Sequence, residues 1–157
     1  MIGPRRRARE VALQILIQMD VNPELEAAAA MSLYFVHLAA DVAADEDTSG
    51  SADPLRAAAP FDRAMVESLV TGVASRRPEL DQLVQDLSRN WRLERMALVE
   101  RNVIRLALYE LKHAKDVPTN VVLDEAIELT KKFGTSEGAS FVNGLLDRAA
   151  SELGQRR

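Results

Sequence analysis

Four arginines stand among the first nine residues, and arginine is the side chain best suited to holding phosphate. They are Arg5, Arg6, Arg7 and Arg9, and an apolar stretch follows them. The planar guanidinium carries donors that match phosphate oxygens, and it does not lose its charge. The chain of 157 residues nevertheless has a formal net charge of -4. This pattern indicates one small, directed nucleic-acid contact on an acidic body rather than a general nucleic-acid coat.

A second basic pair, Arg101 and Arg105, has the i, i+4 spacing of one helix face, and it could join the first set if the helices pack together. The alternative is that a terminal charge run only keeps the protein soluble. Basic side chains at a helix N-terminus oppose the helix dipole, at a cost of a few tenths of a kcal/mol each. A helix selected for stability alone would have acids there, so the placement favours a functional role.

No set of residues predicts catalysis or metal binding. Residues 134–138 match G-x-S-x-G, but that motif needs a preceding strand and a parallel sheet. Residues 45–50 begin like an EF-hand loop, yet an arginine stands at the twelfth position, where the bidentate glutamate belongs. Asp124, Glu125 and Glu128 share a helix face without partners elsewhere, and cysteine is absent. We therefore predict no catalytic residue, no metal and no cofactor.

The arginines must be positioned by a helix, which the apolar spacing behind them predicts over residues 5–20. Its expected inward stripe follows the i, i+3, i+4, i+7 template and consists of Ala8, Val11, Ala12, Ile15, Leu16 and Met19. Arg5, Arg6 and Arg9 fall off that stripe. We therefore expect these three side chains to face solvent.

Apolar periodicity and breakers predict six further helices and no strands. Their expected ranges are 23–43, 61–75, a segment opening at Pro78, 95–114, 120–133 and 136–153. In the second helix Leu25, Ala29, Leu33, Val36 and Ala40 should face inward. Residues 44–60 are acidic and rich in small residues and breakers, which predicts a flexible loop. The prediction is an all-α fold of about seven helices in a single domain over residues 1–157.

Two details within these helices carry expectations of their own. Gly134 is placed to cap the helix over 120–133, and Thr135 or Ser136 to cap the next. Asn143-Gly144 in mid-helix indicates tight packing or a kink. No apolar run approaches the roughly 20 residues needed to cross a bilayer, so we expect no membrane span and a cytoplasmic protein.

Several segments together resemble the bacterial NusB family of transcription antitermination factors. The segments are 5–10, 99–111, 117–134 and 141–147, the last reading Phe-Val-Asn-Gly-Leu-Leu-Asp. The Trp91 and Arg95 segment fits the approach to the central helix of that family. The resemblance covers residues 5–20 and about 76–150, whereas residues 24–62 match poorly.

The resemblance implies two small packed helical bundles without enzymatic activity. It implies binding of the boxA element of ribosomal RNA leader transcripts. The implied partners are NusE, which is also a protein of the small ribosomal subunit, and the RNA polymerase antitermination complex. The implied function is support of processive transcription through terminators.

The resemblance also assigns an RNA face, residue by residue. The implied contacts are Arg5, Arg6, Arg7, Arg9, Glu100, Arg101, Arg105, Glu137 and Phe141. The chemistry agrees, because arginines hold phosphates, a carboxylate accepts from base amino groups, and an aromatic ring stacks on a base. At position 17 some relatives have an aromatic residue, and Ile17 cannot stack on a base as well.

Three alternatives stay open at this point. The chain could be a NusB-like protein-interaction bundle that does not bind RNA directly. It could be the NusB-like N-terminal part of a ribosomal RNA methyltransferase, which would need a Rossmann-like domain downstream. It could also form a homodimer through the apolar part of its first helix, which would hide the arginines.

Overall fold

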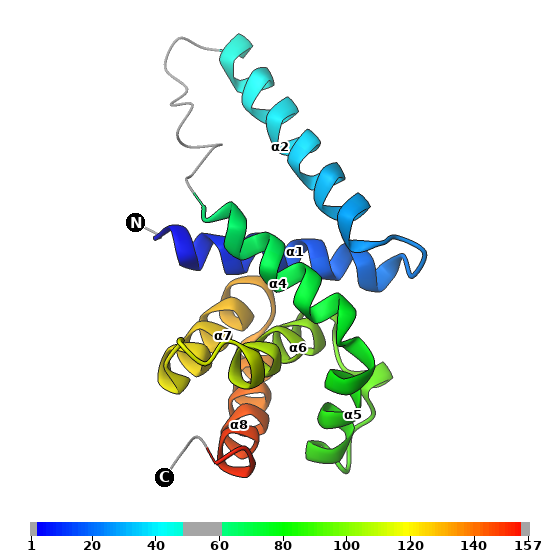
Figure 1. Cartoon of the computed structure of the whole chain (residues 1–157), viewed down its shortest axis with the longest axis vertical. Helices are drawn as coiled ribbons and strands as arrows, with labels where there is room; N and C mark the ends of the chain where they lie inside the picture. The colour runs from blue at the N-terminus through cyan, green and yellow to red at the C-terminus, as the bar shows by residue number, and fades with distance from the viewer. Residues whose placement is uncertain (1–2, 49–60, 155–157) are drawn as a thin grey trace. The chain divides into compact units, whose positions relative to one another are not determined.

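The computed structural model describes residues 3–48 and 61–154, with side chains throughout these ranges except for 39–48. Within them the chain is helical and has no strand, which confirms the predicted all-α class. The helices are α1 (Pro4–Val21), α2 (Ala27–Thr48), α4 (Arg63–Ser75), α5 (Arg77–Leu87), α6 (Leu98–His113), α7 (Thr119–Phe133) and α8 (Ser136–Glu152), with a short 3-10 turn η1 (Leu93–Arg95) (Figure 1).

The chain divides into two compact units, Met1–Thr71 and Gly72–Arg157. The first contains α1, α2 and most of α4. The second contains the end of α4 and all the later helices. Each unit has its own packing, and each is described by itself.

The predicted stripe of α1 is buried, and residues outside the stripe are buried as well. Ala8, Val11, Ala12 and Ile15 are buried as expected. Every residue from 8 to 13 is buried, including charged ones. Pro4 occupies the first turn, where its missing N–H costs nothing and its fixed φ suits a helix. The backbone N–H of Asp62, just before α4, donates to the carbonyl of Pro4 at 3.2 Å.

Helix α2 differs from the sequence prediction in its buried face and in its length. Leu33 and Val36 are 50% and 65% exposed, so their predicted inward orientation was wrong. Ala30 is the buried contact instead. The apolar residues of this helix, many of them alanine, are distributed around most of its circumference, so their spacing did not indicate one buried face. The helix continues to Thr48, so the predicted loop cannot start at 44. The rest of that loop, residues 49–60, lies outside the described residues.

In the second unit α6 is the central element and contacts α5, α7 and α8 (Figure 1). The apolar spacing of this helix predicts that Val99, Val103, Leu106 and Leu111 face inward; the last three are buried and Val99 is half-buried. The expected inward residues of α7 and α8 are buried at Val122, Ala126, Leu129, Leu145 and Ala149. Phe133 is half-buried, and Phe141 is 37% exposed, so the prediction that Phe141 faces inward was wrong. Burying a large apolar side chain stabilises a folded protein by roughly 2 kcal/mol, so these buried side chains form the stabilising core of the unit.

The junction between α7 and α8 is fixed by short-range contacts. Thr135 caps α8 as predicted, because its hydroxyl accepts from the backbone N–H of Gly138 at 2.9 Å. Gly134 follows α7 with a φ of -122°, so it is not a left-handed cap. A side chain there would meet the Thr130 carbonyl oxygen at 2.9 Å, which explains the glycine by close approach. None of the described helices has the length and apolar content of a membrane span.

Candidate nucleic-acid interface

The structure divides the N-terminal arginines of α1 into exposed and buried members. Arg5 and Arg6 are exposed and can reach a polyanion. Arg7 is partly buried, and its Nη1 donates to Oε2 of Glu10 at 2.9 Å. No acidic residue lies in the first turn of α1. Of the arginines on this helix, Arg5 and Arg6 are the exposed ones.

Arg9 is only 4% exposed, so the prediction that it faces solvent was wrong. The sequence stripe failed because α1 is covered on more than one side, which also buries Glu10 at 2% exposure. Buried charges need polar partners, which gives these two positions a structural role. The assignment of Arg9 to RNA stays a prediction that nothing in this geometry supports.

In the second unit Arg105 is engaged within the protein and is only 3% exposed. Its Nε and Nη2 donate to the two carboxylate oxygens of Asp81 on α5 at 2.6 and 3.2 Å. Its Nη1 donates to Oδ1 of Asn102 at 3.2 Å. This bidentate geometry binds the guanidinium strongly. Arg105 therefore joins α5 to α6, while its neighbour Arg101 is half-buried.

Glu100 lies in the first turn of α6 and contacts the first turn of α8. A Cβ built on Gly138 would lie 2.0 Å from Oε1 and 2.8 Å from Cδ of Glu100. Only glycine at position 138 lets the carboxylate approach the backbone so closely. The N-terminus of α8 favours negative charge, which suits a carboxylate at this position. Glu100 is thereby held in place, and it is only 8% exposed.

Three of the residues predicted to contact RNA line one hollow in the second unit. We name it the Glu100 hollow, with a volume of about 400 Å³. Glu100 comes from α6, and Glu137 and Phe141 come from α8. Its full lining is Trp91, Arg95, Met96, Ala97, Glu100, Thr135, Glu137, Gly138 and Phe141. Carboxylates beside exposed aromatic rings can accept hydrogen bonds from base amino groups while a ring stacks on the base.

Two residues of this hollow, Trp91 and Arg95, were not predicted to be functional. Trp91 is 51% exposed, and Arg95 is exposed. Trp91 is the single tryptophan of the chain and stands among arginines between two helices. An aromatic residue interleaved with basic ones is typical of nucleic-acid binding, so that signal was present in the sequence.

A second hollow adjoins the first, since Trp91 and Phe141 line both. We name it the Gly144 hollow, with a volume of about 480 Å³. Asn143 is exposed, and a Cβ on Gly144 would meet nothing within 4 Å. The prediction that Asn143-Gly144 marks tight packing was therefore wrong. Glycine leaves open space here instead of admitting a neighbouring helix.

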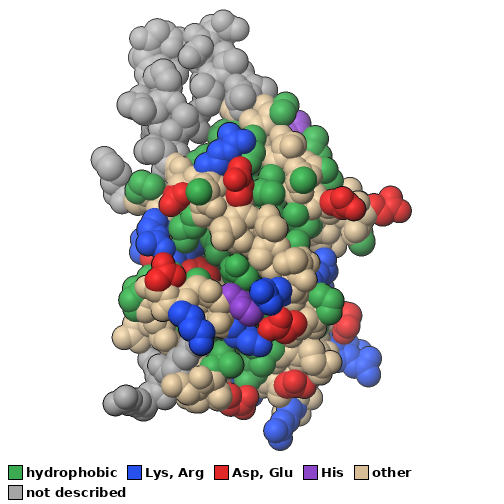
Figure 2. Space-filling model, viewed as in Figure 1, with side chains coloured by type: hydrophobic (Ala, Val, Ile, Leu, Met, Phe, Trp, Pro, Cys, Tyr) green, Lys and Arg blue, Asp and Glu red, His purple; other side chains and the backbone are tan. Residues whose placement is uncertain are grey.

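The surface charge is mixed rather than uniformly basic. On the face drawn in Figure 2, acidic and basic side chains are interspersed. That distribution fits the net charge of -4 and argues against a broad polyanion-binding surface. Within the described part of the chain, no group of three or more potential metal-binding side chains occurs.

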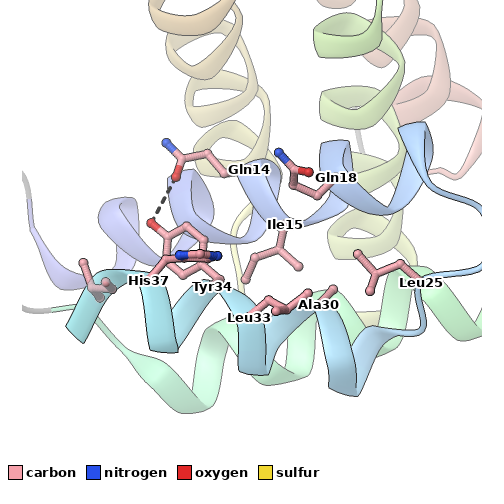
Figure 3. A pocket seen from close by; sticks show the side chains of 9 residues that line it. Gln14, Ile15, Gln18, Leu25, Ala30, Leu33, Tyr34 and His37 are labelled. Atoms are coloured by element: carbon pink, nitrogen blue, oxygen red, sulfur yellow. Dashed lines mark hydrogen bonds between the residues drawn. The ribbon is translucent and has the colours of Figure 1, made fainter. Parts of the chain in front are cut away.

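One further hollow, in the first unit, contains none of the predicted site residues. It lies between α1 and α2 and has a volume of about 420 Å³ (Figure 3). The hydroxyl of Tyr34 donates to Oε1 of Gln14 at 3.0 Å across it. Ile15, Leu33 and His37 are among its other lining residues. No lysine or arginine lines it.

Comparison with protein families gives a match over nearly the whole chain. The model described as NusB family matches residues 6–151. The transcription antitermination protein NusB of Myxococcus xanthus is 43% identical over 152 residues, which cover 97% of this chain and 98% of that protein. The protein of the same name from Geobacter sulfurreducens is 39% identical, with 97% of each chain covered.

Solved structures give the same relationship at the level of the fold. The T. maritima NusB structure has a TM-score of 0.73 and 30% identity, and the match covers 97% of this chain and 94% of that one. A structure of antitermination factors NusB and NusE in complex with dsRNA has a TM-score of 0.70. That match has 21% identity and covers 97% of this chain and 99% of the other, so it supports the fold alone.

Proposed function

Because the chain belongs to the NusB family, we propose that it is a transcription antitermination factor that binds boxA RNA together with NusE. Binding of the RNA leader would support processive transcription by RNA polymerase. The relatives matched over nearly their whole length have the name transcription antitermination protein. That name favours this reading over the methyltransferase alternative. The proposed role involves no catalytic step and belongs in the cytoplasm, where the transcript is made.

The observation that carries the proposal is the Glu100 hollow. It brings together Glu100, Glu137 and Phe141, which the sequence resemblance had assigned to RNA. A hollow with carboxylates and exposed rings suits an unstacked base better than a duplex, whose bases are not free to enter. Arg5 and Arg6 add phosphate contacts from the first unit. These supply affinity without sequence preference, whereas the hollow supplies preference for particular bases.

The partner is part of the proposal because the intrinsic affinity should be low. Few exposed arginines contact phosphate, and the body is negatively charged. A solved structure with this fold is described as antitermination factors NusB and NusE in complex with dsRNA, so in that complex the two proteins and RNA occur together. NusE should therefore tighten binding of boxA RNA by this chain. A homodimer stays a prediction, which sedimentation with and without RNA would test.

The test is fluorescence anisotropy of labelled boxA RNA against a scrambled RNA, with and without NusE. We expect specific binding that tightens in the presence of NusE. The double reversal Arg5→Glu and Arg6→Glu should weaken it by tenfold or more, on the order of the loss of two charge-assisted contacts.

The matched control is Lys115→Glu with Lys131→Glu, which changes the net charge equally at exposed positions of the second unit. The control should retain most of the affinity. An equal loss in both double variants would mean that overall charge, rather than the α1 arginines, determines binding. Absence of specific binding with NusE present would instead support the protein-interaction alternative.

A further inference from the structure

Gly144 is difficult to explain by the stability of α8. A glycine in a helix interior costs roughly 0.5–1 kcal/mol relative to alanine. Such a cost is usual where a positive φ or a close neighbour demands it. The positive-φ glycine among the described residues is Gly154, not Gly144. A Cβ at 144 would meet nothing within 4 Å, so no neighbour excludes it either. What the glycine does is keep the Gly144 hollow open.

Trp91 lines both hollows, and its backbone is hydrogen-bonded within the protein although the residue is exposed. The carbonyl of Trp91 accepts from Oγ of Ser88 at 3.1 Å and from Nε2 of Gln85 at 3.4 Å. The backbone N–H of Trp91 donates to the carbonyl of Ser88 at 3.3 Å. The backbone that carries the indole is thus fixed before any ligand binds. Pre-organisation of this kind lowers the entropy cost of binding.

The two hollows differ in their charged groups, because both have arginine side chains but only the Glu100 hollow has carboxylates. The Glu100 hollow offers carboxylate acceptors from Glu100 and Glu137. The Gly144 hollow is lined by donor-bearing and neutral residues, with two arginines and no acid: Leu87, Ser88, Arg89, Asn90, Trp91, Ser140, Phe141, Gly144, Leu145 and Arg148. Nη1 of Arg148 donates to the Leu87 carbonyl at 2.6 Å, which holds its guanidinium at the hollow. Its remaining N–H groups can donate to a ligand.

We infer that the Gly144 hollow is a second base-binding site, and that two successive unpaired RNA bases lie on either side of Trp91 and Phe141. The base in the Glu100 hollow donates through an amino group to the carboxylates. The base in the Gly144 hollow accepts through its carbonyl oxygens, as uracil or guanine can. The inference rests on the proposed RNA-binding function and names the part of the RNA that this site holds.

Single-stranded RNA is the occupant that the chemistry favours over a peptide or a duplex. Aromatic rings stack on any base, and base–aromatic stacking contributes substantially to single-strand binding. Carboxylates in one hollow, and arginines without carboxylates in the other, suit two bases with different edges. The bases of a duplex are paired and stacked, so they cannot enter two hollows separated by side chains.

The test uses Trp91 as its own reporter, since it is the only tryptophan in the chain. Full-length protein is titrated with single-stranded boxA RNA while tryptophan emission and RNA anisotropy are recorded together. Stacking on the indole should quench the emission in step with the anisotropy rise. The same RNA annealed to its complement should give little quenching.

Gly144→Leu tests the second hollow directly, because the new side chain points into open space and fills it. It should weaken RNA binding by roughly 5- to 100-fold, the loss of one stacked base. Ser151→Leu places the same side chain on an exposed part of α8 outside both hollows, and it should leave the affinity unchanged. Circular dichroism of both variants checks that α8 remains folded.

The outcomes separate this inference from the proposed function. Specific binding without quenching, or with full affinity in Gly144→Leu, overturns the second base site and leaves RNA binding intact. Loss of NusE binding in Gly144→Leu, with RNA binding to the free protein unchanged, would assign the hollow to a protein partner and overturn the inference. Absence of any specific RNA binding overturns both.

Discussion

At the residue scale, the arginines of this chain differ in their exposure to solvent. Arg5 and Arg6 are exposed, whereas Arg9 and Arg105 are buried. Sequence shows the positive charge of all four equally. Only the fold shows that Asp81 approaches the Arg105 guanidinium from 24 positions away. A buried arginine whose charge is matched within the protein is a structural residue first.

Arg105→Met should destabilise the protein by about 3 kcal/mol, because it leaves the Asp81 carboxylate without its bidentate partner. Urea unfolding followed by circular dichroism would measure this. The comparison is Arg92→Met, an exposed arginine, which should change the free energy of unfolding by less than about 0.5 kcal/mol. Similar stability of the two variants would show that the Arg105–Asp81 pair does not stabilise the second unit.

Two glycines of α8 should respond differently to alanine. Gly144→Ala has open space and should raise the free energy of unfolding by about 0.5–1 kcal/mol through helix propensity. Gly138→Ala gains the same propensity but displaces the Glu100 carboxylate, so its net stabilisation should be smaller and its RNA affinity lower.

Adding Glu100→Ala to Gly138→Ala should restore the full propensity gain, since the clash disappears. Thermal denaturation of the single and double variants gives the coupling energy. Strictly additive changes would mean that the Gly138 backbone and the Glu100 carboxylate do not constrain each other.

At the element scale, α5 and α6 are joined by a surface cluster as well as by Arg105. Oε1 of Glu79 on α5 lies 2.6 Å from Nζ of Lys112 and 3.5 Å from Nε2 of His113. The hydrogen bond from Lys112 lowers the pKa of Glu79 below its ordinary value; desolvation opposes this, and the charges of Lys112 and His113 reinforce it. The cluster contributes to holding the N-terminal part of α5 against the C-terminal part of α6.

The sign of this shift predicts a pH dependence. A carboxyl whose pKa is lower in the folded state adds stability above its unfolded pKa, and that stability is lost as the pH falls through the folded pKa. As the pH falls below about 4.5, the free energy of unfolding should therefore fall less for Glu79→Gln than for the unaltered protein. Urea unfolding between pH 6 and pH 3 would measure this. Parallel curves for the two proteins over that range would count against the cluster.

The elements also show where sequence reasoning succeeded. Helices α1, α6, α7 and α8 follow apolar stripes, and their ranges were predicted to within a few residues, as was the start of α5. In α2 the apolar residues surround the helix, so spacing could not identify the buried Ala30. The Glu100 hollow could be predicted only in part. The family resemblance named Glu100, Glu137 and Phe141, but the place of Trp91 and Gly144 beside them depends on how η1 and α8 pack.

At the scale of the whole molecule, a negative net charge limits how the protein can hold RNA. With two to four phosphate contacts to a single strand, the logarithm of affinity should fall with the logarithm of salt at a slope of about -1.4 to -2.8. Base contacts in the hollows do not release counterions, so the preference for boxA over scrambled RNA should persist as salt rises. Anisotropy titrations at several salt concentrations would check both statements. A much steeper slope would mean that more cations take part than the exposed arginines described above.

The order of helices along the second unit also affects how the protein forms. Helices α6, α7 and α8 follow one another directly and pack pairwise, so most of their contacts join segments close in sequence. Closing short loops costs little entropy, and such bundles fold on the order of milliseconds or less. The Glu100 hollow needs η1, α6 and α8 together. During synthesis the Glu100 hollow is therefore completed only after α8 has been made, and then quickly. Helix α8, with Phe141 and Gly144, thus determines when a nascent chain could first bind a base in this hollow.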